Sequence, residues 1–412
     1  MTHPIIIIGA GLAGWTTARE FRKLDTTTPV MLITLDNGDF YAKPSLSNAF
    51  AQGRAPAQLV STAALKMVET LRVTLLANTR VLALDPQTRT VTTAQGEFRY
   101  SQLVLATGAQ PIRVPVAGDA AQQVHSINCL DDFSSFHARL TSAGSYENES
   151  DAQAAPRPKK QVLIMGAGLI GCEFANDLSA SGYSVTVVDP STGPMSTLLP
   201  MQTSAQLREA LAALGVTWHF GATVKSVNQA APALQVELSN GQLVLVDTVL
   251  SAIGLRADTA LAQAAGLACE RGIVVDATLQ TSAPHIYALG DSAQYAPGLW
   301  GDGRSALNGG TPVVAGGRTL PYVLPIMSAA KALAATLAGT PTELVFQLMP
   351  VAIKTPALPI VVASPAPGTP GDWCSIEPGL WQFINAQGQR NGFVLCGKQT
   401  SRRAEQAKLV IL

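Results

Sequence analysis

Two glycine-rich turns and a β-rich end predict an α/β protein with two nucleotide-binding units and a small α+β C-terminal domain. Each turn has the pattern Gly-x-Gly-x-x-Gly, and each directly follows a short apolar run, at residues 5–8 and 162–165. One such pattern is a weak signal, but two of them, 157 residues apart, predict two dinucleotides bound to one chain. Beyond residue 339, short apolar stretches broken by Pro, Gly and Asn predict the third, β-rich part.

The first unit reads as a Rossmann-like strand, turn, helix and strand. The strand at residues 5–8 precedes a helix at 12–24 and a second strand at 30–34. Unpaired N–H groups at the helix N-terminus favour a pyrophosphate, so the turn predicts a binding site for one. Its residues are Gly9, Gly11, Leu12, Ala13 and Gly14. The ribose of such a unit usually binds an acidic residue about 20 positions further on. The nearest candidate is Asp36, and the main chain of Thr34 and Leu35 is expected to share this role.

The second unit repeats this order, with a helix at residues 169–181 and a strand at 185–188. Its turn consists of Gly166, Gly168, Leu169, Ile170 and Gly171. Asp189 ends the strand 23 residues after Gly166, a spacing that fits a carboxylate accepting hydrogen bonds from both ribose hydroxyls. The alternative is a surface aspartate at a strand end. No arginine stands beside Asp189 to bind a 2′-phosphate, which favours NADH over NADPH.

Composition narrows the class of protein. The chain has 412 residues, 47% hydrophobic and 14% charged, as in a globular enzyme of two or three domains. Its formal net charge is zero, which gives no electrostatic reason to expect nucleic acid or an anionic membrane as a partner. No apolar run reaches the roughly 18–20 residues of a membrane span and no secretory signal is evident, so we expect a cytoplasmic protein. The five cysteines and five histidines lack metal-ligand spacing, and no metal is expected.

Several segments together resemble the FAD-dependent pyridine-nucleotide reductases of the glutathione-reductase structural type. Within that group the chain looks like the redoxin reductases, and most like the rubredoxin–NAD reductase branch. The likeness covers nearly the whole length and lies in the first glycine turn and in residues 41–47 (Tyr-Ala-Lys-Pro-Ser-Leu-Ser), 105–109 (Leu-Ala-Thr-Gly-Ala), 168–175, 286–291 and 354–356 (Lys-Thr-Pro). It implies an enzyme that passes a hydride from NADH to FAD, and then single electrons to rubredoxin.

The resemblance also implies a division of the chain. An FAD-binding domain at residues 1–112 and 246–338 would be interrupted by an NADH-binding domain at 113–245. A C-terminal interface domain at 339–412 would pack over the flavin. The loops at 141–160 and 296–320 look longer than usual for the family; we expect surface insertions, with a lid as the alternative for the second.

The family match assigns roles to single residues. It places Lys43 beside flavin N5, paired with Glu173, although a surface role for either side chain is the alternative from sequence alone. Lys354 is a second candidate for flavin contact, from the C-terminal domain. Asp291 would accept hydrogen bonds from the ribityl chain, and a helix starting near Val323 would point its N-terminus at the flavin pyrimidine. Further FAD residues are Val81, Thr107 and Gly108, and a further NAD residue is Gly254.

Residues 40–49 contain no cysteine, whereas the disulfide reductases of the superfamily carry a cysteine pair there. Electrons would therefore leave the flavin directly, one at a time, for an external acceptor. The alternatives are a ferredoxin or flavorubredoxin reductase, an NADH oxidase, and a non-catalytic flavin-binding protein of the apoptosis-factor type. By analogy the pathway would be alkane hydroxylation or the detoxification of oxygen and peroxide. The sequence leaves open whether the protein is a monomer or a homodimer.

Overall fold

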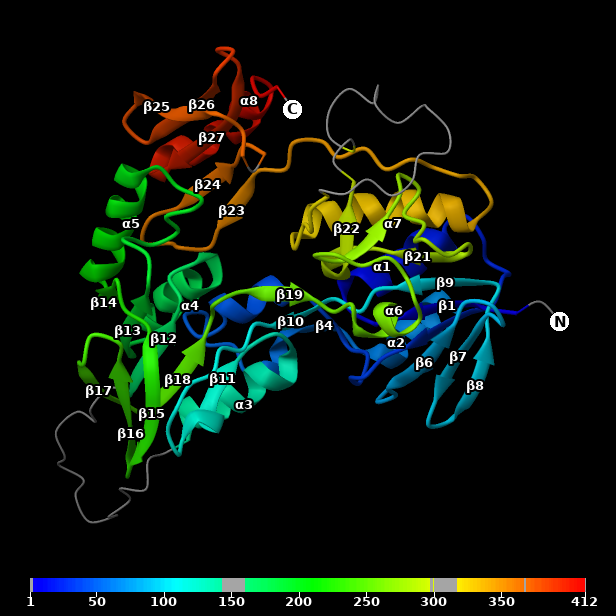
Figure 1. The fold of residues 1–412 in the computed structure, drawn as a ribbon, viewed down its shortest axis with the longest axis horizontal. Helices are drawn as coiled ribbons and strands as arrows, with labels where there is room; N and C mark the ends of the chain where they lie inside the picture. The colour runs from blue at the N-terminus through cyan, green and yellow to red at the C-terminus, as the bar shows by residue number, and fades with distance from the viewer. Residues whose placement is uncertain (1–2, 143–159, 297–298, 300–316, 367, 412) are drawn as a thin grey trace.

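The computed structural model describes residues 3–142, 160–296, 299, 317–366 and 368–411. Three five-stranded sheets within these residues mark three units of the molecule (Figure 1). The long loops expected at residues 141–160 and 296–320 lie mostly outside the described residues, so their expected roles are not addressed. No helix in the described part of the chain is long and apolar enough to cross a membrane.

The first unit is built on an all-parallel sheet. Its strands, in spatial order, are β21 (Ile286–Ala288), β9 (Gln102–Leu105), β1 (Ile5–Ile8), β2 (Val30–Ile33) and β5 (Thr74–Leu76). The helices α1 (Leu12–Arg22) and α7 (Val323–Leu337) pack against each other, and both contribute to the core around this sheet (Figure 1). β1 is the central strand and every one of its residues is buried, which explains its unbroken apolar sequence.

The second unit repeats the parallel sheet. Its strands, in spatial order, are β11 (Val124–Ser126), β18 (Thr248–Ser251), β12 (Gln161–Met165), β13 (Ser184–Asp189) and β14 (Thr217–Phe220). Its helices are α3 (Leu130–Thr141), α4 (Leu169–Ala180) and α5 (Met201–Ala213).

One expected boundary is wrong. The boundary predicted at residue 246 places residues 248–251 in the first unit, but β18 pairs with β11 and β12 in the second sheet. The apolar run at 243–253 contains two strands that belong to different sheets. β17 (Leu243–Val246) is the last strand of a separate three-stranded sheet with β15 (Val224–Ala230) and β16 (Ala233–Leu238), and β18 follows it. The chain returns to the first unit only through β19 (Leu255–Ala257), which pairs antiparallel with β10 (Ala109–Pro111). These two short strands form the crossing between the units.

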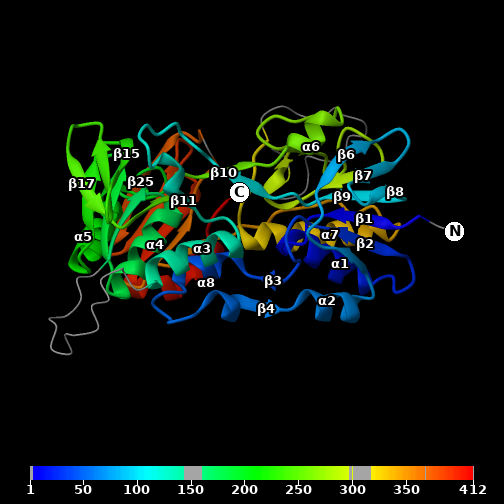
Figure 2. The same cartoon turned by 90° about the horizontal axis from the view of Figure 1, so that it is seen from below.

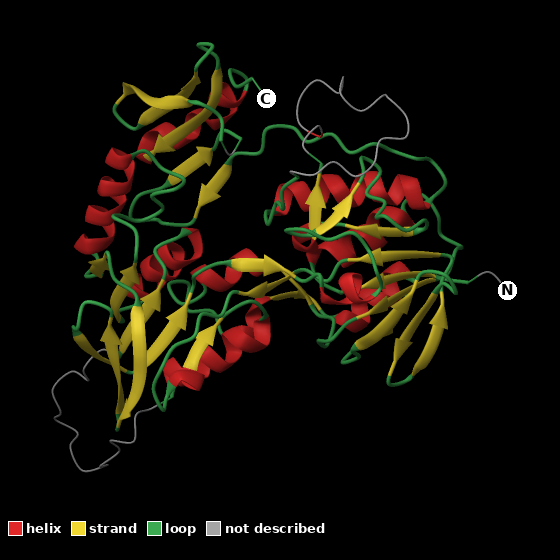
Figure 3. Cartoon of the chain, in the orientation of Figure 1, coloured by secondary structure: helices red, strands yellow, loops and turns green. Residues whose placement is uncertain are grey.

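The C-terminal unit is an antiparallel sheet, and Figure 3 shows that strands and loops make up most of it. Its strands, in spatial order, are β23 (Val351–Ile353), β24 (Ile360–Ala363), β27 (Arg390–Cys396), β26 (Leu380–Asn385) and β25 (Gly371–Glu377), with the short helix α8 (Arg403–Ala407). β26 and β27 pair antiparallel and form a hairpin.

The C-terminal sheet and the second unit share one hydrophobic core. Ile360, Val362 and Val394 of the C-terminal sheet belong to the same buried cluster as Leu207 and Leu211 of α5. The sheet of this domain packs on the second unit, and its packing over the flavin stays a prediction. The loop that follows β23 reaches the place where the three units meet, because Lys354 binds Glu173 of the second unit and lies 3.0 Å from the hydroxyl of Ser47 in the first.

Short elements complete the first unit. They are β3 (Phe40–Tyr41), β4 (Val60–Thr62), α2 (Ala64–Leu71), β6 (Val81–Asp85), β7 (Thr90–Thr93), β8 (Gly96–Arg99), α6 (Ala260–Ala264), β20 (Ile273–Val275) and β22 (Ala293–Tyr295). A 3₁₀ segment, Lys43–Asn48, follows β3. Figure 2 shows β3 and β4 running beneath the junction of the first two units. This path brings the 3₁₀ segment against α4 of the second unit.

Candidate functional site

The first glycine turn has the geometry of a phosphate cradle. Gly9 has a φ of +109°, and a Cβ on it would lie 2.2 Å from the carbonyl oxygen of Ala106. A Cβ on Gly14 would lie 1.9 Å from the carbonyl oxygen of Gly9, so the helix packs on the strand only because both residues are glycine. Gly11 has open space around its Cβ position, and α1 starts at Leu12 without a side-chain cap. Free N–H groups facing open space fit the pyrophosphate of FAD.

The strand end beside this turn carries the expected ribose group. Thr34 is buried and donates its hydroxyl to Asp36 Oδ1 at 2.7 Å, and Gly38 N–H donates to the same oxygen at 3.0 Å. No donor among the described residues reaches Asp36 Oδ2, which leaves this oxygen available for a hydroxyl. Leu35 is 58% exposed, so only its main chain is suited to the predicted contact. Val81 is half-buried at the start of β6.

Asp291 lies beside the first glycine turn. It follows Gly290, whose Cβ position is 3.0 Å from the Cβ of Ala13. Burial raises the pKa of the Asp291 carboxyl, and the positive charge of Lys43 opposes this rise. No hydrogen-bond donor to this carboxylate is found among the described residues. A half-buried carboxylate in this position fits the hydroxyls of a ribityl chain.

α7 begins at Val323 as expected, with no side-chain cap on its first turn. Val323 and Leu324 are 37% and 46% exposed, so the first turn of this helix presents apolar surface. An uncapped N-terminus flanked by open apolar surface fits the pyrimidine edge of a flavin.

Thr107 and Gly108 lie where the first unit meets the crossing strands. Thr107 donates its hydroxyl to the carbonyl of Asp258 at 2.8 Å, and the carbonyl of Gly108 accepts from Asp258 N–H at 2.9 Å. Gly108 has a φ of +74°, with nothing near its Cβ position. Gly254 has a φ of +114° and accepts a hydrogen bond from Ile112 N–H at 3.0 Å. Both glycines therefore shape the crossing between the units.

The expected pair between Lys43 and Glu173 is wrong. Lys43 Nζ donates to Asn128 Oδ1 at 3.2 Å, whereas Glu173 forms its ion pair with Lys354 Nζ. Glu173 is 1% exposed, and it also accepts from the main-chain N–H of Lys354 at 3.0 Å and from the hydroxyl of Ser47 at 2.7 Å. The Lys354 ammonium lies 3.0 Å from the same hydroxyl. Glu173, Lys354 and Ser47 therefore form a triad that joins the three units.

The second glycine turn repeats the first. Gly166 has a φ of +103°, and a Cβ on Gly171 would lie 2.0 Å from the carbonyl oxygen of Gly166. Gly168 has open space at its Cβ position, and α4 starts at Leu169 without a side-chain cap. The next residue, Ile170, is 41% exposed, so this turn also presents an open surface to a ligand.

Asp189 is tied to this turn. Its Oδ2 accepts from Ala167 N–H at 2.6 Å and its Oδ1 from Ser191 N–H at 2.8 Å. Each carboxylate oxygen keeps a further lone pair, so the side chain can still accept from ribose hydroxyls. This geometry holds the carboxylate beside the phosphate cradle, as a dinucleotide site requires.

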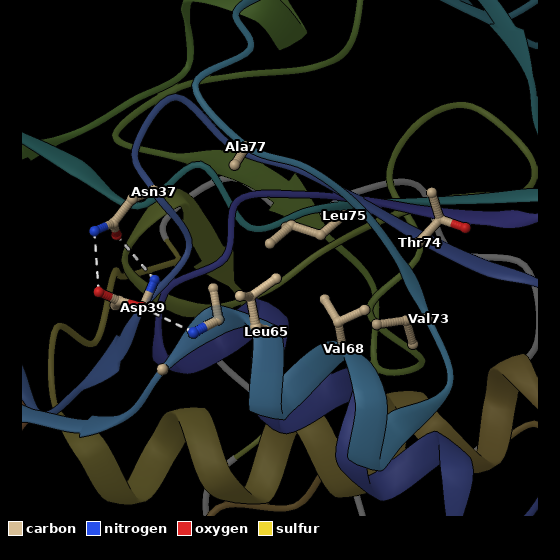
Figure 4. A pocket seen from close by; sticks show the side chains of 10 residues that line it. Asn37, Asp39, Leu65, Val68, Val73, Thr74, Leu75 and Ala77 are labelled. Atoms are coloured by element: carbon tan, nitrogen blue, oxygen red, sulfur yellow. Dashed lines mark hydrogen bonds between the residues drawn. The ribbon is translucent and has the colours of Figure 1, made fainter.

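A surface pocket of about 530 Å³ lies near the end of β2, between α2 and β5 (Figure 4). None of the residues predicted to bind FAD or NADH lines it. Its amide and carboxylate side chains are already bonded, because Asn37 and Asp39 bind each other and Asp39 Oδ1 accepts from Ala64 N–H at 2.8 Å. We therefore do not include it in the candidate site. In the described part of the chain, no group of three His, Cys, Asp or Glu side chains could hold a metal ion.

Two polar residues at this site escaped the sequence analysis. Asn128 accepts from Lys43 and donates its amide to the carbonyl of Ala109 at 2.8 Å. Asp177 accepts two main-chain N–H groups from the first unit. Neither residue belongs to a local motif, and the only signal in the sequence was the placement of Asp177 four residues after Glu173, on the same helix face.

Comparison with known families gives two matches that together span most of the chain. Residues 3–306 match the model described as pyridine nucleotide-disulphide oxidoreductase. Residues 343–410 match the model described as rubredoxin binding C-terminal domain.

Curated relatives match over the full length. The chain is 41% identical over 410 residues to rubredoxin-NAD(+) reductase of Alcanivorax borkumensis, covering 98% of both chains. It is 38% identical over 418 residues to the protein of the same name from Acinetobacter baylyi, covering 99% and 98%. It is also 38% identical over 405 residues to nitric oxide reductase FlRd-NAD(+) reductase of Aeromonas salmonicida, covering 97% and 95%.

Solved structures share the fold. A chain of the covalent putidaredoxin reductase–putidaredoxin complex gives a TM-score of 0.82 at 21% identity, covering 99% of this chain and 93% of the other. A ferredoxin reductase from Rhodopseudomonas palustris gives a TM-score of 0.82 at 24% identity, covering 98% and 94%. The predicted fold class is thereby confirmed.

Proposed function

Because the chain belongs to the pyridine nucleotide-disulphide oxidoreductase family, we propose that it transfers electrons from NADH, through bound FAD, to rubredoxin. It is an FAD-dependent oxidoreductase that uses NADH as the donor. The main observation in favour of rubredoxin as the electron acceptor is the match of residues 343–410 to the rubredoxin binding C-terminal domain. Relatives at 38–41% identity that are named rubredoxin-NAD(+) reductase support the same acceptor.

The geometry supports the division of the two nucleotides proposed for the two turns. Gly9, Gly11 and Gly14 would hold the FAD pyrophosphate with Leu12 and Ala13. Asp291 would bind the ribityl hydroxyls. The main chain of Thr34 and Leu35, the carboxylate of Asp36 and the main chain of Val81 would bind the adenosine half. Gly166, Gly168 and Gly171, with Leu169, Ile170 and Asp189, would hold NADH on the opposite side of the junction.

Charged side chains from all three units surround the proposed flavin edge. Lys43 would reach it from the 3₁₀ segment, Glu173 from α4 and Lys354 from the loop after β23. Bound FAD supplies the chemistry that accepts two electrons as a hydride and releases them singly. In this arrangement Lys43 and Lys354 would place positive charge beside the flavin, and Glu173 would orient Lys354. Thr107, Gly108, Val323 and Gly254 would shape the surrounding walls.

A second acceptor has a specific observation in its favour. The relative from Aeromonas salmonicida, 38% identical over 405 residues, is named for a flavorubredoxin of nitric oxide reduction. A flavorubredoxin is therefore the second candidate acceptor.

An anaerobic stopped-flow experiment tests the proposal. The protein is reduced with NADH and mixed with purified rubredoxin, with a flavorubredoxin, with a ferredoxin or with a small dye. We expect rubredoxin to be reduced at least tenfold faster than the dye. A rubredoxin rate no higher than that of the dye would remove rubredoxin as the acceptor. Hydrogen peroxide formed per NADH in air, measured with and without rubredoxin, separates a reductase from an oxidase.

Pathway and location are further parts of the proposal. We place the enzyme upstream of alkane hydroxylation, one of the two pathways that the resemblance implies for rubredoxin reductases. We keep the cytoplasm as its location, because NADH is made and consumed there. Growth on alkanes after gene deletion, and fractionation of cells, test the two points separately.

A further inference from the structure

One face of α4 carries three buried polar side chains. Glu173, Asn176 and Asp177 are 1%, 3% and 2% exposed. Their spacing of three and four residues places them on the same side of the helix. Buried polar groups are costly unless they are bonded, so the partners of these three define what the face does.

Each partner belongs to a segment outside the second unit. Asp177 Oδ2 accepts from Phe50 N–H at 3.0 Å, and its Oδ1 accepts from Ala51 N–H at 2.8 Å. Asn176 Oδ1 accepts from Ala357 N–H at 3.0 Å. The helix that begins at the second glycine turn therefore holds the turn after the 3₁₀ segment and also the loop after Lys354.

The segment held by Asp177 is the one that carries Lys43 and Ser47. The 3₁₀ segment ends at Asn48, so the two N–H groups bound by Asp177 follow it after one intervening residue. A shift of this segment along α4 would move Lys43 relative to the second glycine turn, and with it the proposed flavin edge relative to the nicotinamide. Hydride transfer is sensitive to such shifts, because the reacting atoms must lie about 3–3.5 Å apart.

We propose that Asp177 is a positioning residue that fixes the 3₁₀ segment against α4 and so aligns the nicotinamide with the flavin. This inference rests on the proposed function. Asp177 acts through the main chain of Phe50 and Ala51, and is distinct from Glu173, which pairs with Lys354.

The chemistry of the side chain explains why a carboxylate is needed. An ionised carboxylate is an acceptor on both oxygens, so it can bind two neighbouring N–H groups at once. An asparagine has the same shape but presents one acceptor and one donor, so one of the two N–H groups would face an NH₂ group. Burial raises the pKa of the Asp177 carboxyl, while the two N–H donors and the charge of Lys354 oppose the rise.

The test compares Asp177→Asn with Ser179→Ala on the same helix. Ser179 is buried, and its hydroxyl has no hydrogen-bond partner in the described part of the chain, which makes it a matched control. Stopped-flow reduction of the bound flavin over a range of NADH concentrations gives a limiting rate and a dissociation constant. Amide hydrogen exchange of residues 49–51 in the FAD-bound protein gives a readout independent of activity.

We expect Asp177→Asn to lower the limiting rate of flavin reduction at least fivefold while the NADH dissociation constant changes less than twofold. Exchange at Phe50 or Ala51 should become at least tenfold faster, and Ser179→Ala should match the wild type in every measurement. An unchanged limiting rate would overturn the proposal. So would a weakened NADH affinity with a normal limiting rate, because Asp177 would then belong to the nucleotide site.

The wild-type protein decides the question if Asp177→Asn does not fold. The amides of Phe50 and Ala51 must then exchange slowly in the FAD-bound wild-type protein, and rapid exchange would show that no anchor exists. If the proposed function itself is wrong, NADH will not reduce the flavin of the wild-type protein. The hydrogen-exchange rates of Phe50 and Ala51 still test whether Asp177 holds this segment.

Discussion

The two glycine turns share one backbone geometry, whereas the helices that follow them differ. The first glycine of each turn has a φ of +109° or +103°, and the last would place a Cβ 1.9 or 2.0 Å from the carbonyl oxygen of the first. α4, however, is buried without interruption from Gly171 to Ser179, while α1 keeps a partly exposed face with Arg19 and Glu20. The glycine-rich loop determines the backbone of the first helical turn. The segments packed against each helix determine which of its later residues are buried.

Equivalent positions show the difference residue by residue. Counted from the turn, Glu173 corresponds to Thr16 and Asp177 to Glu20. Glu20 pairs with Lys23 at 2.6 Å on the surface, whereas Asp177 binds buried main-chain groups of another unit. A nucleotide-binding helix can therefore also serve as the contact between domains, provided that its outer face carries polar groups with partners.

Glu173→Ala should have the largest effect on stability. Removing one partner of a buried ion pair typically costs about 3–5 kcal/mol, and we expect about 3 kcal/mol because the Lys354 side chain is 27% exposed and can turn to water. Thr16→Ala, at the equivalent position, should cost about 1 kcal/mol, since it loses only a neutral hydroxyl. Urea unfolding of both variants measures the two values. Equal losses of unfolding free energy in the two variants would contradict the special role of α4 as a contact between units.

Gly171→Ala should separate the two nucleotide sites. The new methyl group would meet the carbonyl oxygen of Gly166 at 2.0 Å, so the turn must shift. We expect the KM for NADH to rise at least a hundredfold, about 3 kcal/mol, with FAD content unchanged. Gly14→Ala should do the reverse and lose FAD. Flavin absorbance after gel filtration and NADH kinetics check both, and loss of FAD from Gly171→Ala would reverse the assignment of the sites.

Asp189→Ala should have a smaller effect in the same direction. The carboxylate supports Ala167 N–H in the turn and is proposed to bind the ribose. Loss of hydrogen bonds to a charged group costs about 1.5–3 kcal/mol, so the KM for NADH should rise about tenfold or more while the protein stays yellow. A normal KM would mean that the strand-end aspartate only caps the turn.

Glu20→Ala should have the smallest effect. Its partner Lys23 is 60% exposed, and surface pairs on helices contribute about 0.3–0.5 kcal/mol. The free energy of unfolding, measured in urea, should change by no more than this amount, and the rate of flavin reduction by NADH should not change. A large effect would show that the outer face of α1 has a contact that the structure does not contain.

The sequence predicted what local chemistry determines. The glycine turns, the strand at residues 5–8 and the start of the helix at residue 12 followed from short patterns. The boundary near residue 246 was wrong because one apolar run contains both the end of β17 and the start of β18. Only the pairing of these strands in space separates them.

The candidate site was predicted less well, for a physical reason. Lys43 and Lys354 are both plausible partners of Glu173 in a linear sequence. The main chain decides which lysine pairs with Glu173, because both the backbone N–H and the side-chain ammonium of Lys354 donate to this carboxylate. Asn128 and Asp177 bind segments 85 and about 126 residues away, and no local pattern encodes such contacts.

The core that joins the C-terminal sheet to α5 limits how this reductase can be re-engineered. Exchanging residues 343–410 for the equivalent part of another reductase would separate Val362 and Val394 from the apolar side chains of α5 that they pack against. Apolar surface would then be exposed on α5 and on the sheet that was removed. A chimera designed to serve a new acceptor would have to transplant α5 along with the sheet.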